Sequence, residues 1–215
     1  MKKIALSLIA AASAAFSTAS AEDLKVSTSV DYVTEYIFRG VELADAAIQP
    51  GVEFGYGDAT FGVWASSPTN NDDTSDTEID LYGSYNVGLN DLVNVDLGWT
   101  TYVYPNTASQ VDGNDYTNEP FANFNFDTFL APSVLLAYDL NLDNFTIEGS
   151  IGHSWDLPYE NTTLAVGAYL GDVEEDNGSD YIYYGVDTSV SYQMTEHGSF
   201  GVGLSYANND KDASA

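Results

Sequence analysis

Apolar and polar residues alternate at every second position along most of this chain. In residues 78–88, for example, Ile79 and Leu81 fall on one face of an extended strand, and Glu78 and Asp80 fall on the other. Successive side chains of a β-strand point to opposite faces, so this period predicts strands with one apolar face and one polar face. No apolar stripe with helical spacing runs for three turns after residue 21, and we therefore predict an all-β protein.

Eleven segments carry this pattern, and most are as long as the 9–11 residues that a tilted strand needs to cross a bilayer. The predicted strands are 25–39, 46–57, 58–67, 76–88, 91–104, 117–127, 129–140, 144–156, 159–171, 180–193 and 197–207. The chain also carries 16 Tyr, 10 Phe, 3 Trp and 18 Gly. This composition favours strands joined by many turns over a disordered acidic chain, which would be poor in aromatic residues.

The first 21 residues have the layout of a secretory signal peptide. A short basic start, MKK, precedes an apolar run, and a small-residue cleavage site, ASA, ends at Ala21. We therefore expect residues 1–21 to be removed and residues 22–215 to form a single domain.

The charge balance and the lack of cysteine exclude several functions. Without Lys2 and Lys3, three cations remain against 33 acidic residues. Such a chain does not bind nucleic acid, because phosphate contacts need clustered Lys and Arg. The absence of cysteine excludes disulfides, thiolate metal sites and a cysteine nucleophile. No cofactor is implied.

The connections between the predicted strands alternate in length over the first half of the chain. Residues 55–60 and 88–91 form tight links that contain glycine, whereas 67–77, 105–119 and 171–180 are long and acidic. Outer-membrane β-barrels combine short periplasmic turns with long external loops in this way. We therefore predict a transmembrane antiparallel up-and-down β-barrel. The alternative is a soluble secreted β-sandwich, which alternation alone would also permit.

Three segments near the N-terminus resemble the opening hairpins of the TorF-like putative porin family. They are YIFRG at 36–40, AIQPGVEFGY at 47–56 and FGVWASS at 61–67. The matching motif residues are Tyr36, Phe38, Arg39, Gly40, Gly62, Trp64 and Ser66. The resemblance implies a bacterial outer-membrane β-barrel and adds more to the fold than to the function.

The odd strand count departs from the even number that is the rule for single-chain bacterial barrels. The sequence after Tyr206 is polar and lacks the aromatic-ended last strand that the barrel-assembly machinery reads. We therefore expect a barrel of about 12 strands whose last strand is missing through truncation of this sequence. Misplaced strand limits are the alternative explanation of the odd count.

Arg39 is the one arginine of the chain. If the first strand rises from the periplasm, Tyr36 and Phe38 face lipid, while Asp31, Glu35 and Arg39 face the lumen. The predicted lumen residues are Arg39, Asp31, Glu35, Glu53, Glu78, Asp80, Asp96, Glu148 and Asp187. Arg39 then either opposes an acidic wall at a constriction or forms a salt bridge that holds the interior together. Both arrangements favour the passage of cations.

Two further features of the sequence have a site interpretation. The loop acids Asp172, Glu174, Asp176 and Asp180 are oxygen ligands suited to weak divalent cations, which could bridge them to lipopolysaccharide; otherwise they form a solvated loop. His153 is predicted to face outward, and its neighbour Ser154 must then face inward, so the two form no catalytic pair. We predict no enzyme and no protein-bound metal centre.

The predicted function is passive diffusion of small, preferentially cationic solutes through an outer-membrane porin-like channel. The alternatives are a non-conducting barrel with a structural or surface-interaction role, and the soluble sandwich. A barrel would contact outer-membrane lipid, lipopolysaccharide and the barrel-assembly machinery.

Gel mobility separates a barrel from a sandwich. We expect the mature protein to require detergent and to migrate differently on a gel before and after boiling, because barrels resist unfolding by detergent. Full solubility without detergent, with the same mobility in both samples, would instead support the sandwich.

Overall fold

The computed structural model describes residues 9–14, 24–69, 77–105, 115–176 and 178–211. These residues form β-strands joined by turns and loops, with no α-helix among them. No helix long and apolar enough to cross a membrane is found in the described residues.

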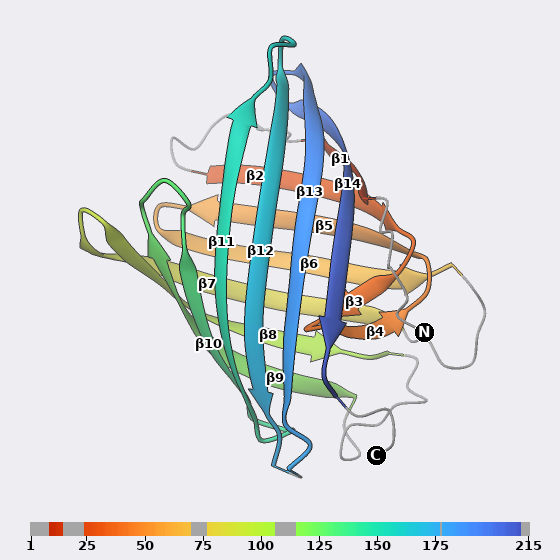
Figure 1. Ribbon diagram of the computed structural model, residues 1–215, viewed down its shortest axis with the longest axis vertical. Helices are drawn as coiled ribbons and strands as arrows, with labels where there is room; N and C mark the ends of the chain where they lie inside the picture. Colours follow the sequence, from red (N-terminus) through yellow and green to blue (C-terminus); the bar gives the residue numbers. More distant parts are fainter. Residues whose placement is uncertain (1–8, 15–23, 70–76, 106–114, 177, 212–215) are drawn as a thin grey trace.

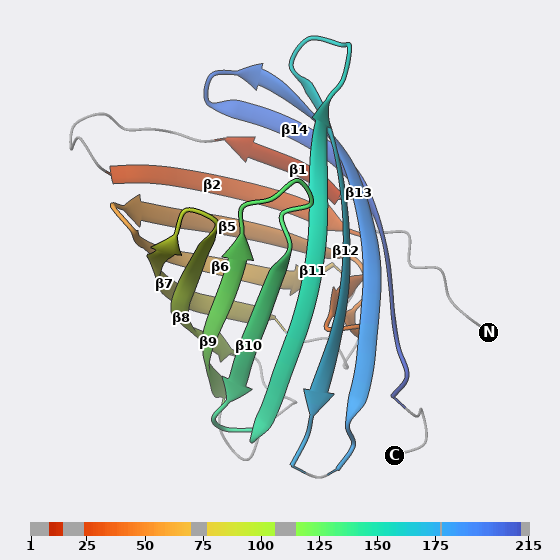
Figure 2. The ribbon, with the colours of Figure 1, turned by 60° about the vertical axis from the view of Figure 1, so that its left-hand side comes forward.

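Eleven strands form one antiparallel up-and-down sheet in which each strand pairs with the next along the chain (Figure 1). They are β2 (Leu24–Val33), β5 (Ala47–Tyr56), β6 (Ala59–Pro68), β7 (Glu78–Asn90), β8 (Val93–Val103), β9 (Tyr116–Phe126), β10 (Ser133–Asp139), β11 (Asn144–Asp156), β12 (Thr162–Glu174), β13 (Tyr181–Thr195) and β14 (Gly198–Asn209). The sheet curves around an interior into an incomplete ring, because its edge strands β14 and β2 do not pair with each other (Figure 2). We call the end where β2, β6, β8, β10, β12 and β14 finish the loop end, and the opposite end the turn end.

Each predicted strand corresponds to one of these eleven, with two substantial differences. The predicted first strand, 25–39, is wrong at its C-terminal end, because β2 stops at Val33. The predicted seventh strand, 129–140, is wrong at its start, because β10 begins at Ser133. Residues before Ser133 form a turn in which Ala131 has a positive φ of 39° and Pro132 has no N–H for a ladder bond.

A short additional strand, β1 (Ile9–Ala14), lies between β14 and β2. It pairs antiparallel with β14 over six residues, but with β2 only through Ala14 and Thr28. Ten antiparallel steps separate β2 from β14, so these two edge strands run in the same direction. An antiparallel ring therefore needs one more strand between them, which is the position expected for the twelfth strand. In the structure, residues of the predicted signal peptide occupy it.

The two faces of the sheet differ in chemistry. Many large apolar side chains are 37–73% exposed in the described part of the chain, and most of these point outward from the ring. Examples on the outer face are Phe54, Phe61, Leu81, Leu97, Trp99, Ile147, Ile151, Leu170, Val186 and Val202. The inner face carries acids, amides, hydroxyls, glycines and tyrosines. Because the apolar face is not covered by a second layer, a soluble sandwich does not describe this fold.

Tyrosines on the inner face lie over glycines of the neighbouring strand. Tyr183 pairs with Gly171, and a Cβ on Gly171 would lie 2.3 Å from Cζ of that ring. Tyr169 covers Gly185 at the same distance, and Tyr82 covers Gly62 at 2.1 Å. Glycine is required at these positions because the ring occupies the space of its missing side chain. The pairs fill the wall of the interior and fix the strand register.

Gly171→Val should destabilise the barrel by about 2 kcal/mol, because the new side chain must displace the fully buried Tyr183 ring. Urea unfolding in detergent micelles measures the change. Gly149→Val is the matched control, since a Cβ at Gly149 meets no atom within 4 Å. That variant should stay within about 0.5 kcal/mol of the parent. Equal effects of the two variants would contradict the proposed packing.

Candidate constriction of the barrel interior

A small hairpin connects β2 to β5 and folds into the interior of the ring (Figures 1 and 2). It consists of β3 (Tyr36–Phe38) and β4 (Val41–Ala44). Phe38 pairs with Val41, so Arg39 and Gly40 form a two-residue turn. Both have positive φ, 47° and 75°, as a type I′ turn requires. A side chain on Gly40 would meet Cβ of Tyr183 at 2.8 Å, so only glycine fits there.

This hairpin corrects the predicted positions of the first motif. Tyr36, Phe38 and Arg39 do not continue the first strand, and neither aromatic ring faces lipid. Tyr36 instead packs on Trp64 of β6, with ring centroids 5.5 Å apart. Phe38 packs on Tyr102 of β8 at 5.9 Å. The prediction failed because alternation cannot show where a strand ends and the chain turns back.

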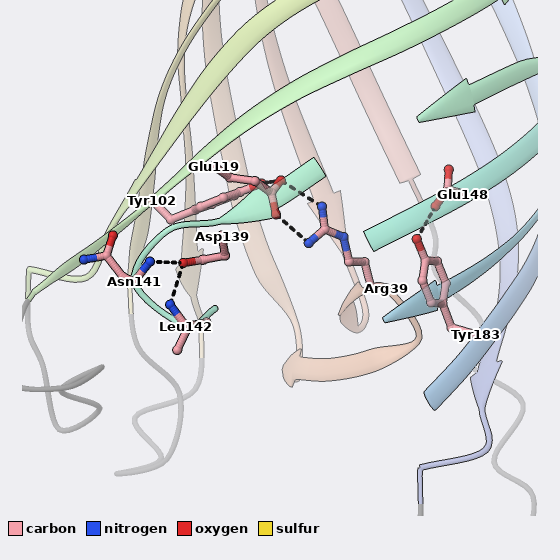
Figure 3. Close-up of polar contacts among 8 residues, drawn as sticks. All are labelled: Arg39, Tyr102, Glu119, Asp139, Asn141, Leu142, Glu148 and Tyr183. Carbon is pink, nitrogen blue, oxygen red and sulfur yellow. Dashed lines mark hydrogen bonds and ion pairs between the residues drawn. The ribbon is translucent and has the colours of Figure 1, made fainter. Parts of the chain in front are cut away.

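Arg39 forms a bidentate ion pair with Glu119 on β9 (Figure 3). Its two terminal nitrogens donate to the two carboxylate oxygens at 2.7 and 2.8 Å. The Tyr102 hydroxyl donates to the same carboxylate at 3.0 Å. Both side chains are largely buried, 13% exposed for Arg39 and 5% for Glu119. Among the two interpretations of Arg39, the salt bridge is therefore present, and it lies inside the ring.

Glu119 was not among the predicted lumen residues. Alternation along the predicted strand 117–127 does place Thr117 and Glu119 on one face, so the polar face could have been read from the sequence. The pairing with Arg39 could not, because 80 residues separate the two partners.

Other contacts hold the hairpin against β12, β13 and β14. The side-chain amide of Asn209 on β14 donates to the Gly40 carbonyl. Val41 packs against a buried cluster of Val173, Tyr181 and Tyr183 from β12 and β13. The hairpin therefore extends from its own strands to β9 on one side and to β12–β14 on the other. It narrows the interior near the loop end.

The second motif lies on β6, and its Trp64 is the residue against which the hairpin packs. Trp64 contacts Tyr36, and Ser66, 1% exposed, accepts a hydrogen bond from Gln49 at 3.2 Å. Gly62 leaves room for the Tyr82 ring. Burial, reinforced by nearby Glu78 and Asp80, raises the pKa of the Tyr36 hydroxyl above its ordinary value.

The predicted lumen acids on the long strands lie on the inner face. Glu53 accepts a hydrogen bond from Tyr82 at 3.0 Å, and Asp96 accepts from Asn86 and Asn125 at 2.6 and 2.7 Å. Glu78 and Asp80 lie on β7 beneath the hairpin. The remaining positions are Asp31 on β2, Glu148 on β11 and Asp187 on β13. Glu35, predicted on the first strand, lies in the short connection between β2 and β3.

Two of these carboxylates have an oxygen atom that accepts no hydrogen bond within the described residues. Oδ1 of Asp31 and Oδ1 of Asp80 are buried and have no hydrogen-bond partner in the described part of the chain. A further inward acid, Asp139, closes the turn after β10 by accepting bonds from the backbone N–H groups of Asn141 and Leu142 (Figure 3). The interior is thus strongly acidic around its one arginine.

The acidic loop residues and His153 do not come together in one site within the described part of the chain. Within the described residues, no group of three or more acids and histidines is placed to hold a metal ion. In the acidic loop, Asp180 instead accepts the backbone N–H of Glu175, which pairs with Lys211. His153 contacts Phe129 and Trp155 on the outer face, in agreement with its predicted direction.

Together, the ring of antiparallel strands, its apolar exterior and its acidic interior define an all-β barrel-type protein with an internal hairpin. Residues 17–215 match the family described as "Bacterial protein of unknown function (Gcw_chp)", and the chain belongs to this family. The resemblance to the TorF-like family remains a prediction beside this assignment. No curated protein matches the chain.

Solved structures with a similar course of the chain include proteins of two bacteria. OccK2 (OpdF) of Pseudomonas aeruginosa is 12% identical, with a TM-score of 0.37, covering 91% of this chain and 69% of that one. OpdQ of the same organism is 11% identical, with a TM-score of 0.35 and coverages of 88% and 69%. A loop L8 deletion mutant of OmpT, an outer membrane protein of Vibrio cholerae, is 12% identical, with a TM-score of 0.34 and coverages of 94% and 97%.

Arg39→Met should lower the free energy of unfolding by about 3 kcal/mol, because it leaves the buried Glu119 without its cation. Lys211→Met is the matched control. It breaks the ion pair with Glu175, but its side chain is 35% exposed, and the change should stay within about 0.5 kcal/mol. Urea unfolding followed by tryptophan fluorescence also reports on Trp64 beside the hairpin. Equal losses in the two variants would mean that Arg39 does not anchor the fold.

Proposed function

We propose that this protein is an outer-membrane porin-like channel for passive diffusion of small, preferentially cationic solutes. The observation that carries the proposal is the hairpin held across the polar interior by the Arg39–Glu119 ion pair.

The size of the ring supports small solutes. Barrels of about 8 strands fill their interior with side chains, whereas those of 16 leave a wide aqueous channel. A ring of eleven strands plus one closing strand lies between these limits, and the hairpin narrows it further. Ions and small molecules are therefore the proposed solutes.

The charge of the interior supports cations. Because Glu119 neutralises Arg39, the remaining inward carboxylates of β2, β5, β7, β8, β11 and β13 dominate the field at the constriction. Rings and walls of acidic side chains attract cations and exclude anions in other pores.

The apolar outer face supports a location in the bacterial outer membrane, reached by export with the predicted signal peptide. Outer-membrane lipid and lipopolysaccharide are then the partners of that face, and the barrel-assembly machinery inserts the protein. The loop end would face the outside of the cell, and weak divalent cations at its acidic loops are part of the proposal.

The second candidate function is a non-conducting structural or surface-interaction barrel. The same hairpin favours it, since its contacts with both walls could close the interior to solutes. Bilayer recordings distinguish a constriction from a plug.

Removing the hairpin should raise single-channel conductance several-fold in a planar bilayer. Val33 and Ala47 are directly paired, so an Asn-Gly turn can replace residues 34–46 without changing the strand register. In the same recordings, the parent should prefer cations in a potassium chloride gradient. Asp31→Asn with Asp187→Asn should reduce this preference, and Glu196→Gln in the exposed β13–β14 turn should not.

A parent that never opens, together with a conducting hairpin deletion, would support the plugged barrel. Anion preference of the parent would contradict the proposed selectivity. Heat-modifiable gel mobility of every variant verifies that it has folded.

A further inference from the structure

A cavity of about 500 Å³ lies in the interior against the hairpin. Phe38 and Arg39 of the hairpin border it on one side. The rest of its wall comes from β8–β13, including Tyr102, Glu119, Glu148 and Tyr183. Because the hairpin borders it, the cavity lies on the route of a solute in the proposed channel.

Aromatic rings supply much of this wall. Phe38, Tyr102, Phe121, Tyr169 and Tyr183 line the cavity from five different elements. The Arg39 guanidinium already lies over the Phe38 ring, 4.7 Å from its centroid, and Tyr183 is covered, so the rings of Tyr102, Phe121 and Tyr169 remain for a ligand. Tyr169 and Tyr183 are themselves in contact, with centroids 6.1 Å apart, and Tyr183 is fully buried. The ring faces are therefore held in place. Several aromatic faces around one space attract a cation through their quadrupoles, most strongly when the cation has shed its water.

The charges of the wall sum to a negative value. Arg39 contributes a positive charge, but both of its terminal nitrogens bond to Glu119, so this pair is neutral. Glu148 is the remaining acid of the wall, and its hydrogen bond comes from the neutral Tyr183 hydroxyl at 2.7 Å. No cation pairs with Glu148 within the described residues. Its charge is available to a ligand. A ligand that suits this cavity is therefore cationic and has an apolar surface for the rings.

We infer that the cavity is a binding site for a small organic ammonium ion. The inference rests on the proposed function and deepens it by naming the solute class. In this arrangement, the ammonium group lies among the aromatic rings near Glu148. Inorganic cations lack the apolar surface, and neutral sugars lack the charge.

Choline is the probe, because 3,3-dimethyl-1-butanol has the same shape without the charge. Isothermal titration calorimetry on the full chain in detergent micelles should show choline binding at least about tenfold tighter than its neutral counterpart. Glu148→Gln should weaken choline binding about tenfold or more. Glu53→Gln is the matched control, since Glu53 also accepts a hydrogen bond from a tyrosine of the interior but lies outside this wall.

Tyr183→Phe separates charge from packing. It keeps the ring and frees Glu148 from its hydrogen bond, so choline binding should be retained. Loss of binding in this variant comparable to Glu148→Gln would show that the Glu148 effect is structural and would overturn the inference. Equal binding of choline and 3,3-dimethyl-1-butanol, preferential binding of glucose, or no binding of choline would overturn it as well.

The binding measurement needs no bilayer, so its outcome does not depend on whether the protein conducts ions. A protein that conducts cations but does not bind choline contradicts this inference alone. A protein that binds choline but never conducts contradicts the proposed channel and leaves the site in place.

Discussion

The bidentate ion pair between Arg39 and Glu119 is the contact on which the interior of this protein depends. It joins the tip of an internal hairpin to the opposite wall of the ring. Removing two charges from water is costly, and a buried pair repays that cost only with good geometry and further hydrogen bonds. Tyr102 supplies one of these bonds. The pair therefore determines where the hairpin lies, and loss of Arg39 alone would leave Glu119 buried and without its cation.

The motif residues acquire one physical meaning from this arrangement. Gly40 permits the left-handed turn and the close approach of Tyr183. Trp64 receives Tyr36, and Gly62 accommodates the ring of Tyr82. The two motifs thus build one contact between the hairpin and the wall, although they lie at least 22 positions apart in the sequence. Their shared role concerns the interior rather than the lipid-facing surface.

Several features followed from the sequence because they depend on local periodicity. Alternation located all eleven long strands and assigned Glu53, Asp80 and Asp96 to the inner face, since neighbouring strand residues must point in opposite directions. The odd strand count also led us to expect a twelfth strand. That position is occupied by β1, which no periodic pattern indicated.

The sequence by itself determined a sheet with an apolar face and an acidic face, because strand geometry converts a period of two into two surfaces. Only the tertiary structure decided that residues 34–46 turn inward and that Arg39 meets Glu119. Both depend on contacts between residues far apart in the chain, where no local spacing records the partner. The single arginine is placed where it is because one wall of a ring curves round to face the other.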